Sequence, residues 1–280
     1  MRYPQAEGCD TFTAEGAYRR TTEDFISELF YRVDETLKEV PKHPQASLWP
    51  REGVTLGLLF ALKGVGKRAF YRWVRRDWRG VLPALPERTR LFRLWATPRP
   101  WTDAVLAAPS VLGGVDSYGS ELLPPRREGR RAQPIGRKGK SHPRWLVGGK
   151  LCLRLTHVGL VGAGDCAGAK APDSAVHPLL EAFEGEMIVL SDTGFQAKEG
   201  DPPNLKLCER GPWNTRMLVE TVLAMLTGGC HLKKVLHRTW AAFHARRAFT
   251  LATFNLLVQW HGLKPDAQGM IRLSFAEFSL

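Results

Sequence analysis

The stretch EMIVLSD, Glu186 to Asp192, is the clearest β-strand in the sequence: an apolar run that passes directly into an aspartate. A second short run, SVLGGVD from Ser110 to Asp116, has the same form. Short apolar runs bounded by turn residues indicate buried strands. A carboxylate at the C-terminal end of a strand lies at the rim of a sheet, where ligands of α/β folds gather. The two stretches therefore predict an α/β fold with two carboxylates at one edge of its sheet.

Helical patterns precede these strands. From Thr22, which can act as an N-cap, apolar residues recur every three or four positions as far as Leu37. Further helices are expected over residues 54–62, 70–78 and 87–95. The glycine turn Gly64 to Gly66 separates the second helix from an arginine-rich third one, an order compatible with helix-turn-helix docking on DNA. The third helix can equally be an amphipathic core helix with a solvated basic face.

The rest of the chain alternates strands and helices. Strands are expected over residues 146–157 and 158–163 as a hairpin, and helices over 174–184, 213–227 and 239–260. Between Leu123 and Arg144 the sequence predicts a Pro/Gly/Arg loop with a single glutamate. The expected organisation is a flexible leader, a helical DNA-binding region, an α/β catalytic domain and a tail: residues 1–20, 21–100, 101–265 and 266–280.

The charge of the chain favours a polyanionic partner. Forty Lys and Arg residues against 28 Asp and Glu leave a formal net charge of +12. Binding to phosphates releases condensed counterions, so such an excess favours nucleic acid. The alternative is that the charge merely keeps the protein in solution. The arginines and lysines expected to contact DNA lie on the third helix and in the basic loop: Arg72, Arg75, Arg76, Arg126, Arg127, Arg130, Arg131, Arg137, Lys138 and Lys140.

A second basic surface is expected on the C-terminal helix. His237, Arg238, His244, Arg246 and Arg247 are spaced so that they can share a helix face and touch DNA.

Other classes of protein are disfavoured by composition. The five cysteines have no paired spacing, which argues against a disulfide framework or a zinc ribbon and favours reduced thiols. No export signal and no apolar stretch long enough to span a membrane is recognisable, so we expect a cytoplasmic, nucleoid-associated protein.

A third carboxylate, Glu220, lies on an expected helix on which Trp213, Arg216 and Glu220 share one face. Three convergent carboxylates repel one another unless cations neutralise them. Hard oxygen ligands select Mg²⁺ or Mn²⁺, and a pair of such ions can promote displacement at a phosphodiester. Asp116, Asp192 and Glu220 are therefore the candidate metal ligands, whereas Asp165 and Asp173 are interpreted as turn or cap residues.

Three groups of residues carry a resemblance to a known family. They are Val115-Asp116-Ser117, then Asp192-Thr193-Gly194-Phe195, then the series Trp213, Arg216, Glu220 and Thr227. The sequence here resembles the DDE transposases of bacterial insertion sequences, whose corresponding groups are V-D-S, D-x-G-aromatic and Y-x2-R-x3-E-x6-K. The resemblance extends over about residues 22–260. It departs from the family where Trp213 replaces the tyrosine and Thr227 the lysine.

The resemblance implies an RNase H-like mixed sheet flanked by helices and preceded by an all-α N-terminal region. Asp116 would lie on the central strand and bridge two ions, with Asp192 on one ion and Glu220 on the other. Arg216 would pair with a carboxylate or bind the DNA backbone beside Trp213. The implied reaction is cleavage at terminal inverted repeats, followed by attack of the freed 3′-hydroxyl on target DNA, by a homodimer.

Two other functions stay open from the sequence. The interval from Asp192 to Glu220 is shorter than in the family, so a catalytically inactive or repurposed DNA-binding protein is the first alternative. The second is an RNase H-like nuclease that cuts nucleic acid without joining it.

Overall fold

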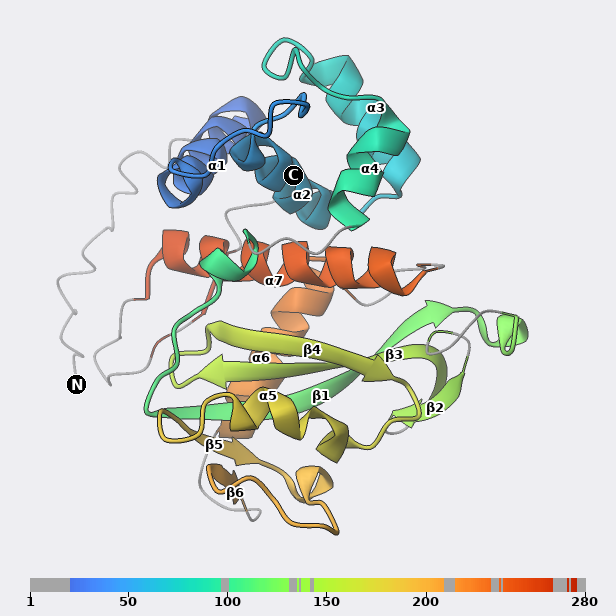
Figure 1. Ribbon diagram of the computed structural model, residues 1–280, viewed down its shortest axis with the longest axis vertical. Helices are drawn as coiled ribbons and strands as arrows, with labels where there is room; N and C mark the ends of the chain where they lie inside the picture. Colours follow the sequence, from blue (N-terminus) through green and yellow to red (C-terminus); the bar gives the residue numbers. More distant parts are fainter. Residues whose placement is uncertain are drawn as a thin grey trace, which may run out of the picture.

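The described part of the chain is a mixed α/β structure in which helices flank a curled mixed sheet, as the sequence predicts (Figure 1). The computed structural model describes residues 21–96, 101–130, 135, 137–141, 144–208, 215–232, 237, 239–263, 271 and 273–275, with 141, 144 and 215–217 in backbone only. The predicted leader and most of the predicted tail lie outside these residues.

Four helices form the N-terminal part, and they lie where the periodicity predicts helices. They are α1 (Thr22–Leu37), α2 (Pro50–Lys63), α3 (Lys67–Asp77) and α4 (Arg88–Ala96). The N-cap of α1 is Thr21, not Thr22, because the Thr21 and Asp24 side chains each accept a hydrogen bond from the other's backbone NH. Helix α2 begins four residues before the predicted Val54, with Pro50 in its first turn.

The turn between α2 and α3 is three residues long. Gly64 ends α2 with a φ of 62°, a left-handed conformation that glycine adopts without strain. The two helices differ in burial: residues 54–62 of α2 are all buried, whereas α3 buries only Phe70 and Val74. Helix α3 therefore exposes its arginine-rich face.

The sheet has six strands. They are β1 (Leu112–Leu123), β2 (Lys138–Ser141), β3 (Arg144–Thr156), β4 (Val161–Gly168), β5 (Ile188–Ser191) and β6 (Leu205–Leu207). Strand β1 is central in the order β2-β3-β1-β5-β6, and β4 pairs with β3. The pairs β1–β3, β2–β3 and β3–β4 are antiparallel, whereas β1–β5 and β5–β6 are parallel.

Several predicted strand boundaries are wrong. Strand β1 does not end at Asp116 but continues to Leu123, because β3 supplies backbone partners along its whole length. The predicted loop from Leu123 to Arg144 contains β2 and the short 3₁₀ turn Pro125–Arg127. Asp165 lies within β4 rather than in a turn, and its carboxylate is 3.4 Å from Arg247 Nη1. Strand β6 was not predicted.

Helices cover both faces of the sheet. On one face, a small core joins β1, β3 and β5 to α5 (His177–Glu181) and to the 3₁₀ turn Asp173–Val176. The single helix predicted over residues 174–184 is thus divided into two short elements. The opposite face is covered by α6 (Thr215–Gly228) and α7 (Trp240–His261).

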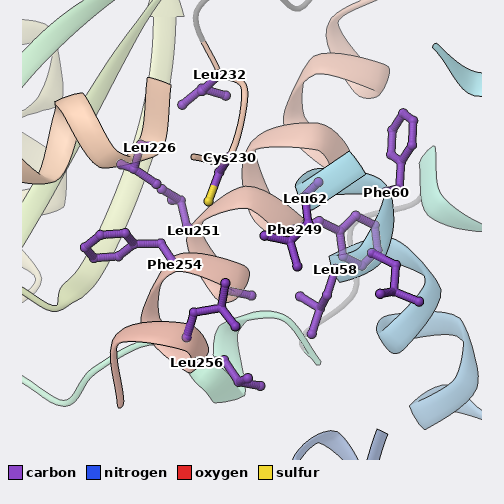
Figure 2. Packing of buried hydrophobic residues seen from close by; sticks show 14 of the residues in the cluster. Leu58, Phe60, Leu62, Leu226, Cys230, Leu232, Phe249, Leu251, Phe254 and Leu256 are labelled. Atoms are coloured by element: carbon purple, nitrogen blue, oxygen red, sulfur yellow. The ribbon is translucent and has the colours of Figure 1, made fainter. Parts of the chain in front are cut away.

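Helix α7 lies between the N-terminal helices and the sheet (Figure 1). Every residue from Phe249 to Val258 is buried. Figure 2 shows side chains of α2 and α7 meeting, with those of α6 beside them. At Gly57 the two helices are so close that an added Cβ would collide with the Phe249 ring. A single hydrophobic core therefore runs from the N-terminal helices into the sheet.

Two buried polar residues of α7 bond to the layers on either side. Arg246 donates to the carbonyls of Phe60 (2.6 Å), Ala61 (2.9 Å) and Cys230 (3.1 Å). Phe60 and Ala61 are in the last turn of α2, whose free carbonyls attract a cation. On the sheet side, Asn255 accepts from the NH of Val161 and donates to its carbonyl, both at 2.8 Å.

The predicted basic surface on the C-terminal helix is therefore wrong for two of its members. Arg246 is only 4% exposed and is occupied by backbone carbonyls. His237 precedes α7, whose first residue is Trp240, and lies in a small cavity with Lys67 and Arg246. Arg238 lies outside the described residues.

Two composition-based expectations can be examined in the structure. The four cysteines that are described, Cys152, Cys166, Cys208 and Cys230, are free. Among the described helices, none combines the length and apolar character needed to cross a membrane.

Replacing Arg246 by lysine is expected to lower the free energy of unfolding by about 2–4 kcal/mol, because one ammonium cannot satisfy three divergent carbonyls in a buried site. Urea denaturation measures the change. Arg72→Lys, on the exposed face of α3, is the control and should stay within about 0.5 kcal/mol of the parent. An Arg246→Lys protein as stable as this control would contradict the capping role.

The pH dependence of stability should reflect His237. Burial, then the neighbouring Lys67 and Arg246 cations, lower the pKa of His237 from 6.5 to about 3. Between these values the unfolded chain binds a proton that the folded protein does not, so stability should fall as the pH drops below about 6.5. His237→Asn should flatten this part of the dependence in melting curves between pH 4 and about 8. Identical slopes for parent and variant would rule out the buried neutral imidazole.

Candidate active site at the centre of the sheet

Asp116 lies in the middle of the central strand. Its backbone pairs with Leu153 on β3, and directly paired residues of antiparallel strands project from the same face. Leu153 belongs to the core formed with α6 and α7, whereas the adjacent Val115 belongs to the core on the α5 face. Asp116 thus projects toward the α6 face, where its side chain is half-buried.

Asp192 follows the last residue of β5. Strands β1 and β5 run parallel with Gly113 opposite Val189 and Gly114 opposite Leu190. The Asp192 carboxylate is exposed and accepts a hydrogen bond of 2.9 Å from the backbone NH of Gly194. Asp116 and Asp192 each lie two residues beyond the last paired positions of β1 and β5, which are Gly114 and Leu190.

Glu220 lies on α6, the helix that packs against β1. Its side chain is exposed, while the neighbouring Val219 and Val222 are buried. Arg216 also belongs to α6, but its side chain lies outside the described part, as does the whole of Trp213. The sheet and α6 thus bring the elements of the three predicted acids together, and the roles of Arg216 and Trp213 stay predictions.

A fourth acid, Asp173, lies beside Asp192. Asp192 Oδ1 is 3.0 Å and Asp173 Oδ2 is 3.5 Å from the position that a Cβ on Gly194 would take. Asp173 also forms an ion pair of 3.0 Å with Lys150, which donates in addition to the carbonyl of Ala171. Asp173 is therefore more than the turn or cap residue predicted from sequence: it lies between β3 and the turn that carries Asp192.

The electrostatics of a neighbouring thiol agree with this placement. Burial raises the pKa of Cys152 well above its usual value, and the Asp173 and Asp116 carboxylates raise it further. Negative charge is therefore concentrated around this part of β1 and β3.

The side chain of His177 is hydrogen-bonded to the turn that follows Asp192. Its Nε2 lies 2.7 Å from the carbonyl oxygen of Phe195, and because a carbonyl only accepts, Nε2 is the donating nitrogen. Phe195 is buried in the α5-side core, at the end of the 3₁₀ turn Thr193–Phe195. The backbone that follows Asp192 is thus anchored at two points, by His177 and by the Phe195 ring.

The fit of a divalent metal ion rests on donor chemistry. Carboxylate oxygens are the ligands that Mg²⁺ and Mn²⁺ prefer, and Asp116 and Asp192 each lie two residues beyond the β1–β5 pairing. Within the described ranges, however, no three His, Cys, Asp or Glu side chains are grouped closely enough to hold a metal ion. The donors are of the type that these ions prefer, and the described residues do not gather three of them into one group.

The basic side chains predicted to contact DNA differ in their solvent exposure and in their ion pairing. Arg72 and Arg75 are exposed on α3, but Arg76 forms a two-point ion pair with Asp77. In the basic segment that follows β1, the Arg127 side chain is half-buried and other predicted contacts are exposed: Arg126, Arg130, Arg137, Lys138 and Lys140. Arg131 lies outside the described residues.

Comparisons with known proteins identify no relative. No protein-family model matches the chain, and searches of curated proteins and of solved structures return no similar protein.

Replacing His177 by phenylalanine keeps the ring but removes the donor to Phe195. The buried carbonyl is then unsatisfied, so we expect a loss of about 1–3 kcal/mol and faster amide exchange over residues 193–195. Hydrogen–deuterium exchange of this segment measures the effect. His157→Phe, at the exposed β3–β4 turn, is the matched control and should leave exchange there unchanged. Unaltered exchange in His177→Phe would show that the bond does not hold the turn.

Proposed function

We propose that this protein is a DDE-type transposase, an enzyme that cuts DNA at the ends of an insertion sequence and joins them to target DNA. The observation that carries the proposal is the register of the two parallel strands β1 and β5. In this register each acid follows the last paired residue of its strand, Gly114 or Leu190, by two positions, and Asp116 projects toward the face that α6 covers.

The topology of the sheet supports the same proposal. The first strand is central, the next strands form an antiparallel meander on one side of it, and later strands extend the sheet in parallel on the other. This is the arrangement expected of an RNase H-like sheet, in which the first catalytic aspartate lies on the central strand. The finer fold assignment is part of the proposal.

Asp116, Asp192 and Glu220 would hold two Mg²⁺ or Mn²⁺ ions. When bound, such ions neutralise the carboxylates and promote in-line displacement at phosphorus. The chain's own contribution is to fix the acids: β1 fixes Asp116 through its pairing with β3, and the Gly194 NH orients the Asp192 carboxylate.

The charged surface suits a double-stranded DNA partner. Exposed arginines of α3 follow a three-residue glycine turn, as in helix-turn-helix proteins. Positive side chains at the start of β2 provide a second contact with the phosphate backbone. In this proposal a homodimer pairs two terminal inverted repeats at the nucleoid.

A second candidate is a DNA-binding protein without catalysis. It is favoured by the exposure of both Asp192 and Glu220 and by the short connection between them, in which β6 is the one strand described. Such a protein would bind DNA through the exposed arginines of α3, and replacement of the three acids would not change its DNA binding.

Cleavage and joining of a labelled duplex that carries the flanking inverted repeat distinguishes these functions. With Mg²⁺ or Mn²⁺ we expect the parent to cut the duplex and to join the freed 3′ end to a target plasmid. Asp116→Asn, Asp192→Asn and Glu220→Gln should each abolish both steps, because each removes a charge that the ions require. Glu199→Gln, an exposed acid between Asp192 and Glu220, is the matched control and should retain both activities.

The other outcomes select the other functions. Cutting without joining would identify a nuclease. Binding of the repeat without cutting, unchanged in all three variants, would identify the non-catalytic protein.

A further inference from the structure

The hairpin of β2 and β3 presents an aromatic ring to solvent. Trp145 is 59% exposed, more than any other tryptophan that the structure describes. The next residue, Leu146, is only 2% exposed. Val147, which lies on the same face of the strand as Trp145, is 0% exposed, so the exposure of Trp145 is confined to the end of β3.

The base of the hairpin packs closely against the rest of the sheet. An added Cβ on Gly139 would collide with the backbone of Ala169, which shows how closely β2 lies against the end of β4. Ile135, which precedes β2, is 2% exposed. A tryptophan has a large apolar ring that contributes strongly to binding when a ligand covers it, so its immediate surroundings decide what it could bind.

Two lysines flank the ring. Lys140 is the direct partner of Trp145 in the β2–β3 pair, and Lys138 Nζ lies 5.2 Å from the centre of a Trp145 ring. Lys138 and Lys140 are two residues apart, so all three side chains share one face. We call Lys138, Lys140 and Trp145 the hairpin patch. Neither lysine forms an ion pair with any carboxylate that is described, so the patch carries uncompensated positive charge.

A second exposed tryptophan shows the contrast. Trp49 is 39% exposed and also lies near cations, with Arg51 Cζ 4.7 Å from its ring. There, however, Arg51 is paired with Asp34 at 2.8 Å, and Glu52 accepts from the Trp49 backbone NH. One of the two cations beside Trp49, Arg51, is thus paired within the fold, and the other, Lys42, lies 5.8 Å from the ring centre, whereas both lysines beside the more exposed Trp145 have no ion pair with a described carboxylate.

We propose that the hairpin patch binds an unpaired base of DNA, with the base stacked on Trp145 and the flanking phosphates at Lys138 and Lys140. An aromatic ring among cations is the arrangement that recognises single-stranded nucleic acid, because every base has a face that can stack. Bases within a duplex have both faces covered, so the ring would act at a DNA end or a junction. This inference rests on the proposed function, in which both are substrates.

The test compares two DNA molecules that differ only in an unpaired 3′ overhang containing 2-aminopurine. The parent should bind the overhang more tightly than the blunt duplex and quench the probe by stacking. Trp145→Ala should weaken overhang binding by about 5- to 100-fold, remove the quenching and leave blunt-duplex binding unchanged. Trp145→Phe should keep part of the preference, since a smaller ring still stacks.

Two controls separate stacking from charge and from folding. Trp49→Ala should behave as the parent with both DNA molecules. Lys138→Ala combined with Lys140→Ala should weaken binding of both and reduce the slope of log K against log salt by about 1 to 2.

The failures of the two proposals are distinguishable. If the parent binds the blunt duplex but Trp145→Ala lowers the affinity for both DNA molecules equally, or for neither, the stacking role is wrong and the proposed function is untouched. If the parent binds no DNA at low salt, both the proposed function and the stacking role are wrong.

Discussion

Two polar side chains buried in α7, those of Arg246 and Asn255, connect the N-terminal helices on one side of this helix to the sheet on the other side. Arg246 bonds to the last carbonyls of α2, and Asn255 bonds to both backbone groups of Val161 at the start of β4. Buried polar groups are tolerated only when they are satisfied, so each residue fixes the position of its partner as well as contacting it. Every residue of α7 from Phe249 to Val258 is buried, which means that this part of the helix requires both neighbouring layers in order to be stable.

This central packing determines where the candidate site lies. With α7 and α6 covering one face and α5 the other, β1 lies in the middle of the sheet, and the parallel pairing of β5 with β1 ends two residues before Asp192 and Asp116. The support around Asp192 is local: His177 bonds to Phe195, and Asp173, held by Lys150, lies next to Gly194. The acids of the two strands are thus fixed by the sheet, while Glu220 depends on the position of a helix.

The helices and the parallel strand β5 were predictable because their hydrophobic patterns are local. The prediction ended β1 at Asp116 because Ser117, Gly119 and Ser120 interrupt the apolar pattern, and pairing with β3 continues the strand beyond them. Strand β4 is rich in glycine, a residue with low β-propensity, so its sequence also predicts only part of the strand. The roles of Arg246 and of the Lys150–Asp173 pair could not be predicted, because their partners lie 186 and 23 residues away in the sequence. The two strand acids were found because each follows an apolar run; whether they and Glu220 act together depends on packing that no spacing encodes.

The close contact at Gly57 has an evolutionary consequence. When two domains of a protein are joined only by a flexible linker, evolution can replace one of them with little effect on the stability of the other, because the two domains share no core. Here any replacement for α2 would need a residue without a side chain opposite Phe249, and carbonyls placed to receive Arg246. The N-terminal helices are therefore not an independent module, because a change in α2 at this contact requires a matching change in α7.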